Sequence, residues 1–474
     1  MAGKDHTLFE DFEYRGRWFL PENPERKVSG TVRFDSTRGI CLELLRSLRE
    51  SPGTNLDEVY KPKLILGVSD NGTPMTLFQT VQTGRASSSE EDPTFFYANY
   101  LFYGNHFHSK SEIRFSSLSV NFTYFEEWMG HATYRSRSPT WEKVVADYSP
   151  PEEIEVRVRK IDARILIHSD LSSNGDWLRS LEWIHTGLLI ISPIEPKDFE
   201  WYRKVLDSLQ KFMTLLVGKP VYPKLVSAWT HRDEPHELSP GRVELFFHQD
   251  FRTPTPPRRS FHQSAITEDI LVPLPSIEED LSQVLNAWFE EAERLDPVYE
   301  VFFGTLYNTR AYSRSQFLSL MQAAESFHRT TKSGKYVRSD KYKEYSRVMK
   351  DAIPEAAPDA LKSKLQSMFD FGNEYSLPKR IEELVDSLPG REIIKKNPNF
   401  VKQVVETRNS LTHLTKKRKA KVLRGADLDN ANEDLRILLT SLFLRRLDID
   451  PEAVYKATTT MVKKRGEYFS IQDD

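Results

Sequence analysis

The hydrophobic and polar positions in the first half of the chain follow mainly the two-residue period of β-strands. Over residues 28–34, Val, Gly, Val and Phe alternate with polar neighbours, so they share one face of an extended segment. Asp70-Asn71-Gly72 lies between two apolar runs, and its Asn-Gly step favours a tight hairpin turn. Enrichment in β-branched and aromatic residues predicts further strands. Strands are therefore expected at 28–34, 63–67, 76–81, 97–107, 112–125, 153–159 and 164–168.

A helical period appears at one place in this half of the chain and at many places beyond residue 275. Residues 198–217 carry apolar side chains at helical spacing, and Gly218 and Pro220 follow as residues that end a helix. Ser276 and Glu279 have the spacing of a capping box, which predicts a helix start at that point. Apolar stripes predict further helices at 281–288, 317–324, 361–371, 378–388, 399–414 and 427–447.

These patterns together predict an α+β protein with several domains. Residues 1–251 are expected to form a β-rich region with at least one packed helix, and a division into two subdomains would fall near residue 150. Residues 252–275 are rich in proline, which fixes φ and removes hydrogen-bond donors, so they are expected to form a connector or an edge strand. Residues 276–474 are expected to form an all-α bundle.

Composition limits the environment of the protein more than its function. The 474 residues contain 28% charged residues and carry a formal net charge of −3, so a nucleic-acid surface would have to be local. The single cysteine, Cys41, excludes an intramolecular disulfide and a Cys-based zinc cluster, and it suits a reducing compartment. With no apolar leader and no apolar run of membrane-spanning length, the protein is expected to be cytoplasmic and free of the membrane.

One cluster of polar residues falls on the helix predicted after Pro398. Asn409 and His413 are four residues apart, so they are neighbours on one helical face, roughly opposite the apolar side that carries Leu411. Arg408 lies between the two sides, and its long side chain can bring the guanidinium toward His413. An imidazole, a permanent cation and an amide are therefore expected to gather away from the core.

This combination suits the cleavage of RNA without a metal. Histidine can accept or donate a proton near neutral pH, which the 2′-hydroxyl and the leaving 5′-oxygen require. Arginine stays charged and matches phosphate oxygens, so Arg408 could stabilise charge at phosphorus, while Asn409 could orient the phosphate or the histidine. His413 is then the general acid or base, and neither a metal nor another cofactor is expected.

The flanking sequence favours an RNA ligand. Between Arg391 and Arg424 there are eleven Lys and Arg residues against two Glu residues. Such a strip attracts a phosphate backbone without reading its sequence. Four consecutive cations directly follow the motif and are candidate RNA-binding residues, although a run of this kind is as often a solvated loop: Lys416, Lys417, Arg418 and Lys419.

Arg408-Asn409-Ser410-Leu411-Thr412-His413 matches the Arg-Asn-x-x-x-His signature of HEPN ribonucleases. The chain most resembles the ApeA-like group of anti-phage defence proteins, in which a β-rich N-terminal region precedes a C-terminal HEPN domain. The run Gln-Ala-Ala-Glu-Ser-Phe-His-Arg at 322–329 is also similar to that group. The resemblance covers roughly residues 276–474, and it is looser for residues 1–250.

The resemblance implies a metal-independent endoribonuclease of an abortive-infection system that leaves 2′,3′-cyclic phosphate ends. It further implies a homodimer or higher homo-oligomer whose two motifs form one site. RNA is the expected partner, with tRNA as one candidate, and the N-terminal region is expected to sense a phage-derived trigger.

A second group of polar residues lies at 325–329, on the earlier helical stripe. Glu325 lies at the edge of that stripe and is a candidate to pair with Arg408 and orient it. His328 lies on the apolar stripe itself, which favours a hydrogen-bonded core histidine over a catalytic one. Arg179 with His185 and Arg242 with His248 have a similar spacing but lack the asparagine, so they are not favoured as sites.

The main alternative is a non-catalytic helical domain that binds RNA or a protein partner, joined to a β-rich recognition region. In that case mutation of His413 would leave binding intact. Carbohydrate binding or processing by the β-rich region is a weaker alternative. Glu126 and Glu127 are expected on a strand, where adjacent side chains point to opposite faces and cannot flank one bond. His106 and His108 are expected to share a strand face, but two ligands are too few for a metal site.

Overall fold

The fold was analysed in a computed structural model of the whole chain. It describes residues 6–49, 60–85, 93–131, 133–140, 143–175, 180, 182–230, 241–249, 270–308, 310–388, 397–413 and 422–470, with some side chains excepted, that of His413 among them. The chain forms two compact units, Met1–Phe289 and Glu290–Asp474, and each is described by itself.

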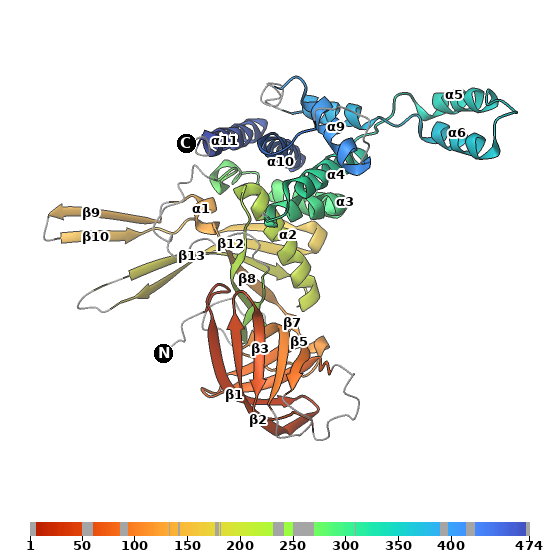
Figure 1. Cartoon of the computed structure of the whole chain (residues 1–474). Coiled ribbons are helices and arrows are strands. Elements are labelled where there is room, and N and C mark those ends of the chain that lie inside the picture. Colours follow the sequence, from red (N-terminus) through yellow and green to blue (C-terminus); the bar gives the residue numbers. More distant parts are fainter. Residues whose placement is uncertain are drawn as a thin grey trace. The chain divides into compact units, whose positions relative to one another are not determined.

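The first unit begins with a closed six-stranded antiparallel barrel (Figure 1). Neighbouring strands follow the order β6-β3-β2-β1-β4-β5, and β5 pairs with β6 to close the ring. Closure leaves the barrel without open edges along the paired stretches. Its strands are β1 (Phe12–Leu20), β2 (Asn23–Asp35), β3 (Gly39–Leu44), β4 (Leu64–Ser69), β5 (Pro74–Arg85) and β6 (Thr94–Tyr103).

The barrel strands confirm the alternating pattern of the sequence. On β2, Val28, Val32 and Phe34 are each at most 1% exposed, as one face of a strand turned to the core requires. β4 and β5 pair across the predicted turn, where Gly72 has φ of +86°, a conformation that glycine adopts without strain. Gly30 is needed for a different reason, because a Cβ there would lie 2.4 Å from the Glu43 carbonyl oxygen on β3.

A second run of strands continues the sheet from one edge of β6. β5 pairs along the whole of β6, so β3 and β16 share the other edge, β3 at Thr94–Ala98 and β16 at Tyr100–Tyr103. From β16 the order continues β15-β8-β13-β12-β11. These strands are β8 (Ser117–Phe122), β11 (Ile154–Val158), β12 (Ala163–Asn174), β13 (Glu182–Pro193), β15 (Pro223–Trp229) and β16 (Arg242–Phe247). The smaller elements are η1 (Lys110–Glu112), β7 (Arg114–Phe115), α1 (Phe125–Met129), β9 (Tyr134–Thr140), β10 (Lys143–Tyr148), η2 (Arg159–Ile161) and β14 (Lys197–Asp198).

Two of the predicted strands were wrong in their extent. β6 ends at Tyr103, because Gly104 takes φ of +114° and turns the chain, so His106 and His108 lie outside a strand. The run predicted at 112–125 is divided among η1, β7 and β8, and α1 follows it. Glu126 and Glu127 therefore lie in the first turn of a short helix rather than on a strand.

Helix α2 (Phe199–Val217) is the helix predicted in this half, and its ends agree with the sequence signals. The Asp198 side chain accepts a hydrogen bond from the Trp201 amide at 2.9 Å, and Gly218 ends the helix at φ of +80°. Its buried face packs aromatic rings against the sheet, with Phe199 beside Phe102 and Tyr202 beside Phe115. This packing confirms a β-rich region with at least one packed helix.

The second unit is helical in its described residues, as the sequence predicted. The capping-box prediction was wrong, because Ser276 belongs to a short turn, η4 (Leu274–Ser276), and its hydroxyl donates to the Pro273 carbonyl. The helix therefore begins later, at Leu281, and runs on from the first unit into the second. The helices are α3 (Leu281–Tyr307), α4 (Ser313–Thr331), α5 (Ser339–Asp351), α6 (Asp359–Phe371), α7 (Leu377–Asp386), α9 (Phe400–His413), α10 (Ala426–Arg446) and α11 (Pro451–Ser470).

The core of the second unit is built around α4, which contacts α7, α9 and α10. Phe443 on α10 lies within 5.0–5.5 Å of the rings of Tyr299, Phe302 and Phe327, measured between ring centroids. α5 and α6 lie side by side as a helical hairpin inserted between α4 and α7 (Figure 1). Among the described residues, no helix is long and apolar enough to cross a membrane.

Candidate functional site

The motif predicted from the sequence occupies the last part of α9. Phe400, Val404 and Thr407 face the core and are at most 3% exposed, and this spacing of three to four residues fixes which side of the helix is buried. Leu411 was expected on the same buried side but is half-buried. Arg408 is half-buried and Asn409 is exposed, so both lie off the core face, as predicted.

The Arg408 guanidinium has two partners among the described residues. Its Nη1 donates to Asn409 Oδ1 at 3.3 Å, and its Nη2 lies 3.7 Å from Glu325 Oε2. Glu325 comes from α4, which packs against α9. The side chains of Arg408 and Glu325 are 33% and 24% exposed. The structure therefore brings together three of the residues that the sequence singled out.

His413 is the last residue of α9, one helical turn after Asn409. Its side chain lies outside the described residues, as do Lys416, Lys417, Arg418 and Lys419 of the basic run. Two cations of the wider strip, Lys402 and Arg424, are exposed. Leu423 donates its backbone N–H to the Thr407 hydroxyl at 3.1 Å, so the chain returns to α9 close to the motif.

His328 is the core histidine that its place on the apolar stripe predicted. Its side chain is fully buried and lies between Glu383 and Arg380 of α7. Burial, which penalises the charged imidazole, lowers the pKa of His328 despite the neighbouring Glu383 carboxylate. His328 is thus a structural residue held apart from solvent.

Three residues around this histidine, Glu374, Arg380 and Glu383, had no signal in the sequence, whereas Arg329 belongs to the polar group predicted at 325–329. Glu383 and Arg380 each contact His328. Arg329 pairs with Glu325, and Glu374 lies between Arg329 and Arg380 and pairs with both. Glu374 and Arg329 are 45 residues apart, so no helical spacing relates them. Arg380 looks like a surface residue of an amphipathic helix, yet its side chain is only 3% exposed. A helical pattern predicts which face is buried but does not predict a buried cation.

The other residues considered as sites have structural partners. Glu126 accepts hydrogen bonds from the Asn121 amide at 2.8 Å and from the Gly187 backbone at 3.1 Å, which ties α1 to the sheet. Burial raises the pKa of Glu127. The His106 imidazole lies 2.8 Å from the Gly67 carbonyl oxygen, while His108 is exposed. Among the described residues, no group of three His, Cys, Asp or Glu side chains is placed to hold a metal ion.

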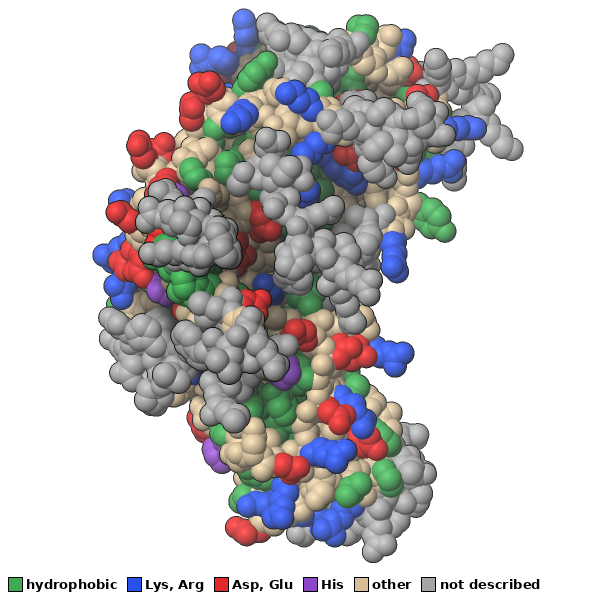
Figure 2. Space-filling view, turned by 90° about the vertical axis from the view of Figure 1, so that its left-hand side faces the viewer, with side chains coloured by type: hydrophobic (Ala, Val, Ile, Leu, Met, Phe, Trp, Pro, Cys, Tyr) green, Lys and Arg blue, Asp and Glu red, His purple; other side chains and the backbone are tan. Residues whose placement is uncertain are grey.

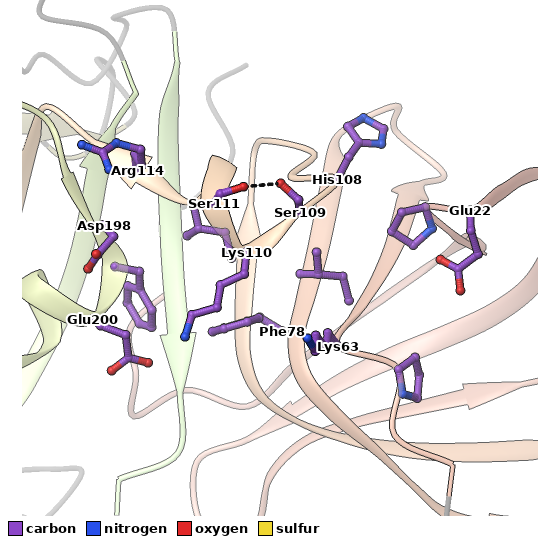
Figure 3. A pocket seen from close by; sticks show the side chains of 15 residues that line it. Glu22, Lys63, Phe78, His108, Ser109, Lys110, Ser111, Arg114, Asp198 and Glu200 are labelled. Atoms are coloured by element: carbon purple, nitrogen blue, oxygen red, sulfur yellow. Dashed lines mark hydrogen bonds between the residues drawn. The ribbon is translucent and has the colours of Figure 1, made fainter.

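A pocket of about 800 Å³ lies in the β-rich unit, between the barrel and the start of α2. Phe78 and Phe199 line it, with their rings edge to face and 6.3 Å between centroids. Figure 3 shows Lys110 extending toward Phe78 and Glu200, with Glu22 on the opposite side. Lys63, Lys110 and Arg114 balance the carboxylates of Glu22, Asp198 and Glu200, so the lining favours neither an anion nor a cation.

The visible surface agrees with the small net charge of the chain. Figure 2 shows cationic and anionic side chains interspersed on the face in view, including the barrel in the lower part of the picture. This mixture matches the formal net charge of −3. In its described residues, the face in view therefore lacks the uniformly basic surface that is typical of a general nucleic-acid-binding protein.

Comparisons with known families give one match in each of the two compact units. The family model for the ApeA N-terminal domain 1 matches residues 13–288, and the model for the Apea-like HEPN domain matches residues 318–453. The second match contains Glu325 and the motif at 408–413. No curated protein and no solved structure matches the chain. The first match alone covers more than half of the 474 residues, and the chain therefore belongs to the ApeA-like HEPN proteins.

Proposed function

We propose that this protein is a metal-independent endoribonuclease of an anti-phage, abortive-infection defence system. The observation that carries the proposal is the pairing of Arg408 with Glu325, at 3.7 Å, beside Asn409 on the exposed side of α9. A cation held in this way by a carboxylate from a second helix is suited to receive a phosphate in one orientation. HEPN domains are typically ribonucleases, which supports the same assignment for residues 318–453.

In this proposal His413 moves protons and Arg408 stabilises charge. The ribose 2′-oxygen attacks phosphorus while His413 accepts its proton, and the bond from phosphorus to the 5′-oxygen breaks. Arg408 donates hydrogen bonds to the phosphate oxygens as negative charge grows on them. Asn409 orients the phosphate or His413. The products are a 2′,3′-cyclic phosphate and a 5′-hydroxyl, once the leaving oxygen has received a proton.

A dimer would supply that second proton. One motif provides one imidazole, whereas the reaction uses a base and an acid, so a two-fold pairing of the α9 faces would place two His413 side chains at one cleft. The β-rich region, matched by its own family model, is then free to recognise a phage-derived trigger. Lys416, Lys417, Arg418 and Lys419 are proposed to attract RNA through its phosphates.

The decisive experiment compares RNA cleavage by the wild-type protein with that by Arg408→Ala and His413→Ala. Both variants are expected to lose cleavage of single-stranded RNA and tRNA and to lose cellular toxicity. Arg408→Ala should fold almost as the wild type does, because the partly exposed Arg408–Glu325 pair contributes only about 0–1 kcal/mol to folding. Arg338→Ala is the matched control, because Arg338 is 87% exposed and its loss removes one positive charge elsewhere in the same unit.

The chemistry of the products separates this proposal from its alternatives. Cleavage should continue in excess chelator, should spare DNA, and should weaken steeply as salt rises. Products with 5′-phosphate ends, or activity that chelator abolishes and magnesium restores, would indicate a metal nuclease instead. RNA that binds equally well to wild type and His413→Ala but is cut by neither would favour the non-catalytic binding domain.

A further inference from the structure

Glu325 is shared between two arginines rather than paired with Arg408 alone. Its Oε2 faces Arg408, while its Oε1 accepts hydrogen bonds from Arg329 Nε at 3.2 Å and from Arg329 Nη2 at 3.1 Å. Both donors of this guanidinium converge on the one oxygen Oε1, and they fix the position of that oxygen more than a single contact does. The direction in which Glu325 presents its second oxygen to Arg408 therefore depends on Arg329.

Arg329 is itself held from its other side. Its Nη1 donates to Glu374, and Glu374 Oε2 also accepts from Arg380 Nη2 at 3.2 Å. The neighbouring guanidinium of Arg329, through its hydrogen bond, lowers the pKa of Glu374, so this carboxylate is charged at neutral pH. Glu374 thus links an exposed arginine on α4 with a buried arginine on α7.

The buried end of these contacts is fixed by hydrogen-bond chemistry. Arg380 donates through Nε to the Tyr375 carbonyl at 3.0 Å, and its Nη1 lies 3.0 Å from His328 Nδ1. Because arginine has no acceptor, His328 Nδ1 must accept, and its Nε2–H then donates to Glu383 at 2.7 Å. A single tautomer of a fully buried histidine therefore anchors Arg380.

The middle of these contacts lies at the base of the α5–α6 hairpin. Lys335 and Glu374 form an isolated antiparallel bridge where the chain enters and leaves the hairpin. The Asn373 side chain accepts from the Val337 N–H at 3.0 Å and donates to the Val337 carbonyl at 2.9 Å, which holds the two segments together. Movement of the hairpin base would therefore move Glu374 with it.

We propose that Glu374, Arg329 and the buried His328–Arg380 pair are positioning residues for Arg408, acting through Glu325. This inference rests on the proposed function, because Arg408 is the member of the network that would touch the scissile phosphate. A partly exposed Arg–Glu pair at 3.7 Å has little rigidity of its own. The contacts through Arg329, Glu374 and Arg380 hold Glu325 in place for Arg408. The same contacts connect the motif with the base of the α5–α6 hairpin.

Kinetics of the full-length protein on a single-stranded RNA of mixed sequence test the proposal. Glu374→Gln and Arg329→Lys are expected to lower kcat about 10-fold while KM changes little, because a misplaced guanidinium mainly loses transition-state stabilisation. The double variant Glu374→Gln/Glu325→Gln should be no slower than the slower single variant, because both residues act through one line of contacts.

Glu291→Gln is the matched control. Glu291 pairs with Arg446 between α3 and α10, and its side chain is 13% exposed, so the variant breaks a partly buried ion pair away from Arg408. It is expected to lose stability but keep the wild-type kcat. A similar fall in kcat in Glu291→Gln would show general destabilisation, and multiplicative effects in the double variant would show that Glu374 and Glu325 act independently. Either result overturns the positioning role.

A structural experiment distinguishes failure of the positioning proposal from failure of the proposed ribonuclease function. In a crystal structure of the Glu374→Gln protein, which needs no activity, the Arg408 guanidinium should leave Glu325. An unchanged Arg408–Glu325 pair overturns the positioning proposal even if the wild-type enzyme cleaves RNA. Loss of cleavage in Arg408→Ala together with a wild-type kcat in Glu374→Gln does the same. Cleavage that survives Arg408→Ala instead removes the proposed function.

Discussion

In the proposed reaction, the orientation of Arg408 matters more than its contribution to folding stability. Its pair with Glu325 is partly exposed, and such pairs contribute only about 0–1 kcal/mol to folding. A phosphate oxygen that arrives at Arg408 competes with Glu325 for the same guanidinium. The proposed site therefore rests on an ion pair that is weak enough to be displaced by a phosphate, while the position of Glu325 defines where Arg408 would meet that phosphate.

His328 makes folding stability depend on pH. Its folded pKa lies below the ordinary value of about 6.5, because the imidazole is buried and its Nδ1 accepts from Arg380. At pH values between the folded and the unfolded pKa, His328 is protonated in the unfolded chain but not in the folded one. The contribution of His328 is full above about pH 6.5 and is lost as pH falls from there toward the lowered pKa.

Replacement of His328 with glutamine tests this sign. Glutamine can still donate to Glu383 and accept from Arg380 but does not titrate, whereas the neighbouring Glu383, Arg380 and Lys332 are present in both proteins. The excess stability of wild type over His328→Gln, measured by chemical denaturation, should shrink as pH falls from 7.5 to 5. The slope should not exceed about 1.4 kcal/mol per pH unit. A constant or growing difference would contradict the buried neutral imidazole.

At the scale of elements, α2 shows how much of a helix can be predicted from signals within its own sequence. Its start at Asp198, its apolar face and its end at Gly218 were all readable from the sequence, because capping and amphipathic packing act in the same segment. α1 and α5 carried no comparable signal. α1 buries three apolar residues, but its five residues are too few for a helical period to be recognised. α5 buries only Ser346, so it lacks the apolar stripe that a prediction requires.

The cap of α2 gives a prediction at this scale. Asp198→Ala removes the acceptor of the Trp201 N–H and should destabilise the β-rich unit by about 1 kcal/mol. Asp198→Asn keeps an acceptor at the same place and should cost much less. Thermal unfolding followed by tryptophan fluorescence measures both. Equal losses in the two variants would mean that the charge at the helix start, rather than the hydrogen bond, is what matters.

The same distinction applies to the candidate site. Arg408, Asn409 and His413 could be grouped from the sequence because helical spacing within α9 relates them. Glu325 was a weaker inference, since it depended on two helices packing together. Glu374 and Arg380 could not be predicted, because the fold of α4, α7 and the hairpin base brings Glu374 to Arg329 and Arg380 to Glu374. Local periodicity predicts faces of elements, whereas contacts between elements require the tertiary structure.

At the scale of the whole molecule, the proposed chemistry predicts self-association. Sedimentation of the full-length protein should show a dimer, and specific activity should fall on dilution below its dissociation constant. Asn409→Arg adds a cation on the exposed face of α9 and should weaken association by placing like charges across the two-fold axis. Gln366→Arg, at an exposed position of α6, is the control. A strictly monomeric wild type with full activity would refute the shared cleft.

The shared edge of β6 has a consequence for the order in which this protein can be made. The six barrel strands are complete by Tyr103, but the stretch Tyr100–Tyr103 finds its partner on that edge only at Glu244–Phe247. At ribosomal rates of about 5–20 residues per second, some 140 residues separate the two, so this edge waits on the order of 10 s. During that interval a newly made barrel offers an open strand to any neighbouring chain. Synthesis of β16 ends this exposure, because it converts the edge of a barrel into the interior of a longer sheet.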